Sequence, residues 1–425
     1  MKKGSADRQW AMVAIMVLVG APGIVMRLTG YAPNPEMDAL GFGIAILAAA
    51  FLLSWAAETA EMDIPQGMAI AAIAFIAVLP EYAVDAVLSW RAGADPAEAA
   101  KGLAIANMTG GNRLLIGIGW TTVFALFFYR TRLKQLVVDK HRALELTFLF
   151  VATVYIGLIG FRHTLTLIDT IVLVSMFFCY FFFTSKIESE DVELVGPAKA
   201  MGGLPTKRRR AMVIALLIYS AAVIFCSAAP FADSLVHTGE RLGVSQFLLI
   251  QWLAPIASEA PEVLVAGMLA WRGRAAVGMG ALISSEVNQM TLLVGTLPLV
   301  FALAGGGFHL TGGLPLDGRQ REEILLTAAQ SAFAVSVFAN LKMGTREAVT
   351  LFTLFGASLL IPSREVRLFY AAAYCVACVV VLFVGRAALP TTLKAAWHTL
   401  RGHPDLSDAA AADTPAVWSG GGPPD

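Results

Sequence analysis

Long apolar stretches, separated by short polar segments, run through most of the chain. A helix needs about 20 consecutive apolar residues to cross the ~30 Å hydrocarbon core of a bilayer. The stretches at 66–90 and 243–271 are interrupted by Gly, Pro and polar residues, which does not suit the short alternating strands of a lipid-facing β-barrel. We therefore predict an all-α polytopic membrane protein with about twelve transmembrane helices, at 10–28, 39–58, 66–90, 102–129, 143–160, 167–184, 211–230, 243–271, 276–305, 322–340, 346–362 and 365–385.

The basic residues give the orientation, because Lys and Arg gather in cytoplasmic loops. With helices that alternate from a cytoplasmic N-terminus, 21 of the 31 Lys and Arg fall on the cytoplasmic side and 9 on the outside. The first stretch follows Lys2, Lys3 and Arg8 but is long and lacks a clear small-residue cleavage site, so we predict a retained helix and not a signal peptide. Both termini are expected in the cytoplasm, at the plasma membrane of a bacterium.

Composition supports this class and excludes others. Hydrophobic residues make up 57% of the 425 residues and charged residues 15%, whereas a soluble domain carries about a quarter charged residues. The net charge is +0, which leaves no polycation for nucleic acid, so the lipid bilayer is the expected partner. Cys375 and Cys378 have metal-ligand spacing, but no second ligand pair accompanies them, so we expect packing and no cofactor.

Two passages of the chain resemble each other. Pro80-Glu81 and Trp90-Arg91 recur, with the same spacing between them, as Pro261-Glu262 and Trp271-Arg272. The pattern Leu-Leu-x-Gly that ends at Gly117 recurs after them and ends at Gly295. The repeat unit therefore spans five predicted helices, and because five is odd, the copies must cross the membrane with opposite polarity. Inverted repeats of this kind are typical of secondary transporters, whose substrate site lies near the midplane between the copies.

The repeat divides the chain into segments. We expect two five-helix repeats, with one flanking helix at each end and a linker whose basic run 207–210 anchors it at the cytoplasmic face. The C-terminal tail is expected to be disordered, since it is rich in Ala, Gly, Pro and Asp. The predicted boundaries are 1–37 for the N-terminus and first flanking helix, 38–185 for the first repeat, 186–210 for the linker, 211–362 for the second repeat, 363–401 for the last flanking helix and 402–425 for the tail.

The doubled Pro-Glu pair is the candidate chemistry. A proline inside a helix removes one backbone hydrogen bond and frees a carbonyl near position i−4. Glu81 directly after Pro80, and Glu262 directly after Pro261, place an anion beside such freed carbonyls. Carboxylate and carbonyl oxygens together suit a hard cation.

These residues resemble the sodium/calcium exchanger superfamily of cation antiporters, in which each inverted repeat carries a Pro-Glu kink followed by a polar helix. The resemblance implies that Glu81 and Glu262 are the carboxylates that coordinate the transported cation. It implies a transporter and not an enzyme, with transported cations in place of cofactors. The polar stretches that match are Asn107 and Asn112 in the first repeat and Ser284, Ser285, Asn288 and Gln289 in the second.

The departures from the family pattern bear on the coupling ion. The usual Gly-Thr-Ser-x-Pro-Glu is replaced by a segment with Ala77 and Val78 in the first repeat, and only Ser258 keeps a hydroxyl in the second. The position of Gln289 is closer to that in calcium/proton exchangers. We therefore expect exchange of Ca²⁺, or another cation, for H⁺ by alternating access, with Na⁺/H⁺ and Na⁺/Ca²⁺ exchange as alternatives.

Further charges fall inside the predicted helices: Asp85 and Glu259 close to the Pro-Glu pairs, and Glu286 and Arg113 in the polar stretches. A charge at a helix centre costs on the order of 2.5–3.5 kcal/mol on insertion scales, so these side chains must pair or line a wet cavity. Arg113 is expected either as a counter-ion to Glu286 or Asp85, or as a built-in cation that modulates the site.

Two other function classes have less support. An intramembrane hydrolase would need a nucleophile and base, but no His-Glu-x-x-His or Gly-x-Ser-x-Gly motif occurs in the chain. A passive cation channel would show no steep dependence of flux on an opposing ion gradient. The doubled acidic motif favours an antiporter over both.

Overall fold

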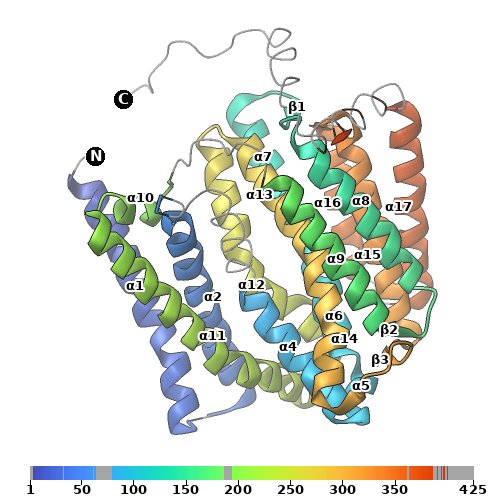
Figure 1. Ribbon diagram of the computed structural model, residues 1–425, viewed down its shortest axis with the longest axis horizontal. Helices are drawn as coiled ribbons and strands as arrows, with labels where there is room; N and C mark the ends of the chain where they lie inside the picture. Colours follow the sequence, from blue (N-terminus) through green and yellow to red (C-terminus); the bar gives the residue numbers. More distant parts are fainter. Residues whose placement is uncertain are drawn as a thin grey trace.

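The computed structural model describes residues 3–31, 33–60, 62–63, 79–185, 194–360 and 363–385, with a few positions between 390 and 400. Helices dominate, and four three-residue strands join them in pairs (Figure 1). The helices are α1 (Lys3–Thr29), α2 (Pro35–Ala60), α4 (Leu79–Ala94), α5 (Pro96–Lys101), α6 (Leu103–Leu114), α7 (Thr121–Thr131), α8 (Arg142–Ile159), α9 (Leu167–Thr184), α10 (Pro197–Gly202), α11 (Thr206–Leu242), α12 (Gln246–Trp271), α13 (Ala275–Asn288), α14 (Val294–Phe301), α15 (Gly318–Val337), α16 (Thr345–Leu360) and α17 (Arg364–Val384). Shorter π and 3₁₀ segments are η1 (Leu115–Trp120), η2 (Gln289–Leu293), η3 (Ala302–Gly306) and η4 (Phe338–Asn340), and the strands are β1 (Gln135–Val137), β2 (Thr164–Thr166), β3 (Gly313–Pro315) and β4 (Lys342–Gly344).

Every predicted membrane stretch overlaps a helix. Within the described part of the chain, ten helices are long and apolar enough to cross a membrane. The other two predicted spans correspond to α4 and α16, which have 16 residues each. The first half of the 66–90 stretch lies outside the described residues, so the count of twelve stays a prediction. The tail 402–425 and linker residues 186–193 also lie outside them.

The linker is partly helical where it is described. α10 packs against α1 and α2, and α11 begins at Thr206, so the basic run belongs to the first turns of a helix and not to a loop. Arg209 donates to both carboxylate oxygens of Asp63, at 2.7 and 2.8 Å. These hydrogen bonds hold the pKa of Asp63 below its usual range. The basic run thus fastens α11 to the end of α2.

Two long helices are interrupted in corresponding places. The predicted helix 102–129 is α6, η1 and α7 in succession, and 276–305 is α13, η2, α14 and η3. In both copies a π-helical segment follows the polar stretch. Such π segments occur often at functional sites, because they shift the helix face on which later side chains lie.

The strands show how the two copies are related. β1 pairs with β4 and β2 pairs with β3, both antiparallel. The offset in numbering that carries Gly117 onto Gly295 also carries β1 onto β3 and β2 onto β4, and it carries the pair Gln135–Gly344 onto the pair Gly313–Thr166. Each strand therefore pairs with a strand of the other copy, as two copies related by a two-fold axis in the membrane plane require.

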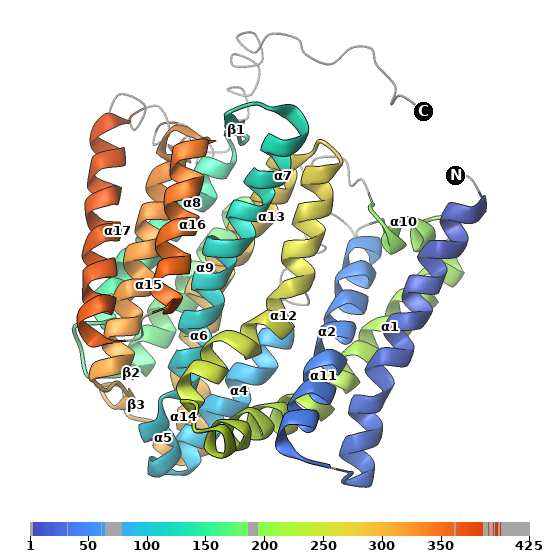
Figure 2. The same cartoon turned by 180° about the vertical axis from the view of Figure 1, so that it is seen from behind.

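The two strand pairs lie at opposite ends of the molecule, called here the β1–β4 end and the β2–β3 end (Figure 1). α1 begins and α17 ends at the β1–β4 end. α1, α2 and α11 form a group at one side of the remaining helices in both views (Figures 1 and 2). This arrangement agrees with termini on one side of the membrane.

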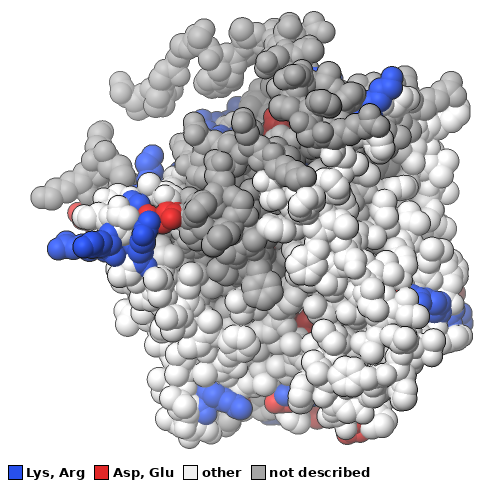
Figure 3. Space-filling view, in the orientation of Figure 1, with Lys and Arg blue, Asp and Glu red and all other residues white. Residues whose placement is uncertain are grey.

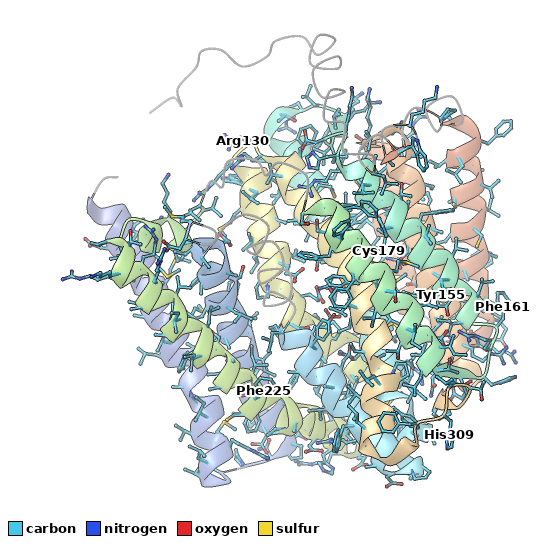
Figure 4. All side chains as sticks on the ribbon, viewed as in Figure 1. Arg130, Tyr155, Phe161, Cys179, Phe225 and His309 are labelled. Carbon is cyan, nitrogen blue, oxygen red and sulfur yellow. The ribbon has the colours of Figure 1, made fainter. Side chains whose placement is uncertain are left out.

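Charge is distributed as a bilayer requires. On the face in Figure 3 the basic and acidic side chains gather toward the ends, and the wide band between them is uncharged except for acidic atoms near its middle. Arg130 lies at the β1–β4 end and His309 at the β2–β3 end, with apolar Phe225, 68% exposed, on the outer surface between them (Figure 4). All four cysteines are free thiols, and Cys378 is buried beside α15.

Close packing of α6 on α12 yields the first testable prediction. A Cβ on Gly110 would lie 1.7 Å from the backbone oxygen of Gln251, so Gly110→Ala must push the two helices apart. We expect loss of monodisperse protein in size-exclusion chromatography. Gly356→Ala is the matched control, since nothing lies within 4 Å of that position and alanine favours a helix. Equal behaviour of the two variants would contradict the packing described.

Candidate functional site

Glu81 and Glu259 approach each other inside the molecule, where α4, α6 and α12 meet (Figure 2). Glu81 lies in the first turn of α4 and is 3% exposed, and Glu259 lies in α12 and is 1% exposed. Their carboxyl groups lie close enough for their charges to interact. A Cβ on Gly111 of α6 would lie 3.1 Å from Glu81 Oε1 and 3.6 Å from Glu259 Oε1. Glycine at 111 therefore leaves open a space that both carboxyl groups border.

Amide side chains hold this cluster from the polar stretches. Asn107 Nδ2 donates to Asp85 Oδ1 at 2.8 Å, and Gln289 Nε2 donates to Glu259 Oε1 at 2.6 Å. Tyr82, next to Glu81, donates its hydroxyl to Asn288 Oδ1 at 3.2 Å. The polar stretch of each repeat thus contacts the helix that carries that repeat's acidic residue, and the Tyr82–Asn288 hydrogen bond joins the two repeats beside the pair.

The candidate site residues carry several oxygen atoms without a hydrogen-bond partner. Each belongs to a buried acidic or amide side chain, and a carboxylate or carbonyl oxygen can only accept hydrogen bonds or bind a cation. Hard cations such as Ca²⁺ take oxygen ligands of this kind. The unpartnered atoms are Glu81 Oε1, Asp85 Oδ2, Glu259 Oε2, Glu286 Oε2, Asn107 Oδ1, Asn112 Oδ1 and Gln289 Oε1.

The described residues contain no group of three or more His, Cys, Asp or Glu side chains placed to hold a metal ion by themselves. A cation at the Glu81–Glu259 pair would need further ligands from amide or backbone oxygens or from water. Gln289, whose amide nitrogen donates to Glu259, is one amide side chain at this pair.

Glu262, the predicted counterpart of Glu81, lies on α12 close enough to Glu81 for their charges to interact. It lies beside Ser285 and is only half-buried, whereas Glu81 interacts with Glu259. Glu259 and Glu262 lie three residues apart, on neighbouring positions of one helix face. Ser258 Oγ bonds to the backbone oxygens of Ala254 and Pro255, at 3.4 and 3.3 Å. Glu81, Glu259 and Glu262 therefore form one interacting acidic cluster, in which Glu259 interacts with Glu81 and Glu262 with Ser285.

The prolines are placed as follows. Pro261 lies inside α12 together with Pro255, so the helix lacks two backbone hydrogen bonds near the carboxyl pair. Pro80 is the second residue of α4, and the chain before Leu79 lies outside the described residues. A kink at Pro80, and the residues Ala77 and Val78, are therefore not described.

The predicted partners of Arg113 are wrong. Its guanidinium donates to Glu323 Oε2 and to Ser358 Oγ, both at 2.8 Å. It also lies 5.0 Å from the centre of the Trp252 ring. Arg113 is two positions beyond Gly111, so its side chain leaves α6 on a different face, toward α15 and α16. Asp85 binds Asn107 instead, and Glu286 accepts from Ser331 at 3.3 Å.

The sequence interpretation missed three buried polar residues. Gln251 Nε2 donates to Glu323 Oε2 at 2.9 Å, inside the bundle. Glu145 of α8 is bound by Arg142 at 2.7 Å. The offset that relates the strands also carries Glu145 onto Glu323, so the two acids hold equivalent positions in the two copies. Acidic residues at equivalent positions near the ends of predicted membrane helices were the signal that could have found them.

Known proteins share this sequence pattern and this fold. The family described as "Sodium/calcium exchanger protein" matches residues 37–186 and 212–364. The crystal structure of the H⁺/Ca²⁺ exchanger CAX is 38% identical, with a TM-score of 0.88 over 93% of this chain and 99% of that one. No curated protein sequence matches the chain.

More distant structures share the fold. The structure of native YfkE is 13% identical, with a TM-score of 0.57 over 86% of this chain and 99% of that one. The sodium-calcium exchanger NCX_Mj is 16% identical, with a TM-score of 0.51 over 76% and 98%. With the family match over more than half of its length, the chain belongs to the sodium/calcium exchanger family, whose members are membrane cation exchangers.

Proposed function

We propose that this protein exchanges Ca²⁺ for H⁺ across a membrane by alternating access. The observation that carries the proposal is the closeness of the buried carboxyl groups of Glu81 and Glu259. Within the described part of the chain, no Lys, Arg or His side chain forms an ion pair with either. The pair therefore has no built-in cation to neutralise it.

The closeness of the two carboxyl groups determines which ions the site can hold. Two carboxylates this close in a region of low dielectric cannot both carry an unshared negative charge, so either a proton or a cation must lie with them. A divalent cation can displace the protons, and protons can displace the cation. Because the two occupants compete for one site, loading by one requires release of the other, and their fluxes are coupled.

Three features support Ca²⁺ and H⁺ over Na⁺. The site offers carboxylate and amide oxygens, the ligands that Ca²⁺ prefers. Ser258 directs its hydroxyl to backbone oxygens of its own helix. The 38% identical structure is that of a protein titled an H⁺/Ca²⁺ exchanger. We place the protein in a bacterial plasma membrane with both termini in the cytoplasm, which the shared end of α1 and α17 supports.

The experiment is ion flux in proteoliposomes that contain a pH-sensitive dye and no sodium. We expect external Ca²⁺ to enter while protons leave the lumen, so the internal pH should rise. Protein-free liposomes are the control. Ca²⁺ uptake that requires internal Na⁺ and leaves the internal pH unchanged would favour sodium/calcium exchange instead. Proton movement that Na⁺ drives and Ca²⁺ does not would favour sodium/proton exchange.

A further inference from the structure

A cavity of about 320 Å³ opens near the β2–β3 end, between the first residues of α6, α12 and α15. Phe247 and Arg319 line it, and the Arg319 guanidinium lies 3.9 Å from the centre of the Phe247 ring. Lys101 lies on its third side. Two basic side chains and one acidic side chain, Asp317, line this cavity, so it carries an excess of positive charge and does not suit stable binding of a cation.

One face of α12 leads from the cavity to the carboxyl pair. Phe247, Gln251, Pro255 and Glu259 follow one another at intervals of four residues, so they lie along a single stripe of the helix. Pro255 borders the same space as the carboxyl groups, 3.9 Å from the position of a Cβ on Gly111. The stripe therefore connects the cavity at the β2–β3 end with Glu259 along one face of α12.

Hydrogen bonds between three helices close this route. Gln251 of α12 donates to Glu323 Oε2 of α15 at 2.9 Å and lies 3.4 Å from Thr109 Oγ1 of α6. All three side chains are at most 3% exposed. Glu323 lies four residues after Arg319, so the closure sits one helical turn deeper than the cavity on α15 as it does on α12. At the other end of the stripe, Glu262 is half-buried beside Ser285.

We propose that Gln251, Thr109 and Glu323 form the gate that closes the cation pathway toward the β2–β3 end. The inference rests on the proposed function, because only alternating access requires a closed end. When the carboxyl pair faces the β2–β3 end, the hydrogen bonds of Gln251 break and α12 separates from α15 at this level. Arg113 keeps Glu323 paired at 2.8 Å, so opening leaves no isolated buried charge.

The second copy of the repeat supplies a matched comparison. Glu145 occupies the position in α8 that Glu323 occupies in α15, but inverted symmetry places it toward the β1–β4 end. It is bound by Arg142 of its own helix and contacts Ser284. A change at Glu145 therefore repeats the chemistry of a change at Glu323 without touching the proposed gate.

The test measures access from one side of the membrane. The four cysteines, Cys179, Cys226, Cys375 and Cys378, are replaced by Ser, and Pro255→Cys places a thiol on the stripe, bordering the space of the carboxyl pair. A membrane-impermeant thiol reagent is added to vesicles of known orientation, and the labelling rate is measured from each side. Leu310→Cys, 59% exposed in the segment before β3, reports which side carries the β2–β3 end.

We expect slow labelling of the reporter from the β2–β3 side and a rate about tenfold higher in Gln251→Leu, the change expected when two hydrogen bonds that favour one state are removed. Thr109→Val, which keeps the shape and loses one bond, should raise the rate less, and it replaces Gln251→Leu if that variant does not fold. Glu145→Gln should leave the rate unchanged.

Rates unaffected by both gate variants, or raised as much by Glu145→Gln, would overturn the proposal. Labelling does not depend on which ions are exchanged, so a failure of Ca²⁺/H⁺ coupling would appear only in the internal-pH experiment.

Discussion

Glu81→Gln and Glu259→Gln are each expected to reduce Ca²⁺-driven proton movement by on the order of a hundredfold. Each removes one negative charge from the carboxyl pair, and the loss of a charge-assisted interaction of about 3 kcal/mol corresponds to that factor. Glutamine has nearly the same size, and removal of a buried charge lowers the cost of membrane insertion, so both variants should fold. The measurement is internal pH in sodium-free proteoliposomes, with folding checked by size-exclusion chromatography.

Two further variants make this result specific. Glu262→Gln should reduce exchange by a smaller factor, because Glu262 lies at the edge of the cluster beside Ser285 and is half-buried. Glu36→Gln changes an exposed acid that pairs with Arg241 at 2.9 Å, and it should leave exchange intact. Near-normal exchange by Glu81→Gln or Glu259→Gln would show that the carboxyl pair is not the cation site.

Arg113→Met is expected to lower the free energy of unfolding by about 3–5 kcal/mol, the usual cost of removing one partner from a buried ion pair. Arg113 and Glu323 are both almost fully buried, so the substitution removes the closer counter-ion of Glu323 and leaves it only Arg367, 3.7 Å from Oε1. The double variant Arg113→Met/Glu323→Met removes both charges and should recover much of the loss. Thermal unfolding in detergent measures the difference between the single and double variants.

The matched control is an exposed pair of the same kind. Arg241→Met breaks the pair with Glu36, and exposed pairs contribute at most about 1 kcal/mol. A single Arg113 variant as stable as the Arg241 variant would mean that Arg113 is not a counter-ion of Glu323. Additive losses in the double variant would mean that the two residues act independently.

Much of the fold was accessible from sequence, because helix-length apolar stretches and an odd repeat leave few arrangements for a membrane chain. The sequence did not show whether Glu259 or Glu262 lies closer to Glu81. The Pro-Glu motif aligns Glu81 with Glu262, but three residues along a helix amount to less than one turn, so both acids point to the same side of α12. Which of them meets Glu81 depends on how far α12 is shifted along α4, and only the packed structure gives that shift.

The partner of Arg113 could not be predicted from the sequence for a related reason. Glu323 lies 210 residues away in the sequence, and the pair forms because α6 and α15 pack side by side. The sequence indicated correctly that a charge inside the membrane must be compensated. It could not indicate which residue compensates the charge of Arg113, because that depends on which helix packs against the face of α6 that carries Arg113.

The exchanged strands have a mechanical consequence. The β1–β4 pair joins the two copies at one membrane surface, and the β2–β3 pair joins them at the other. Because the copies are joined at both surfaces, they cannot rotate apart about a hinge at one surface. The helices joined directly to these strands, α7, α8, α9, α15 and α16, form a frame braced at both surfaces. α2, α4, α11 and α12 carry no strand at either end, and they include both helices of the carboxyl pair. We therefore expect the movement that turns the proposed cation site from one side to the other to be a displacement of these helices relative to that frame.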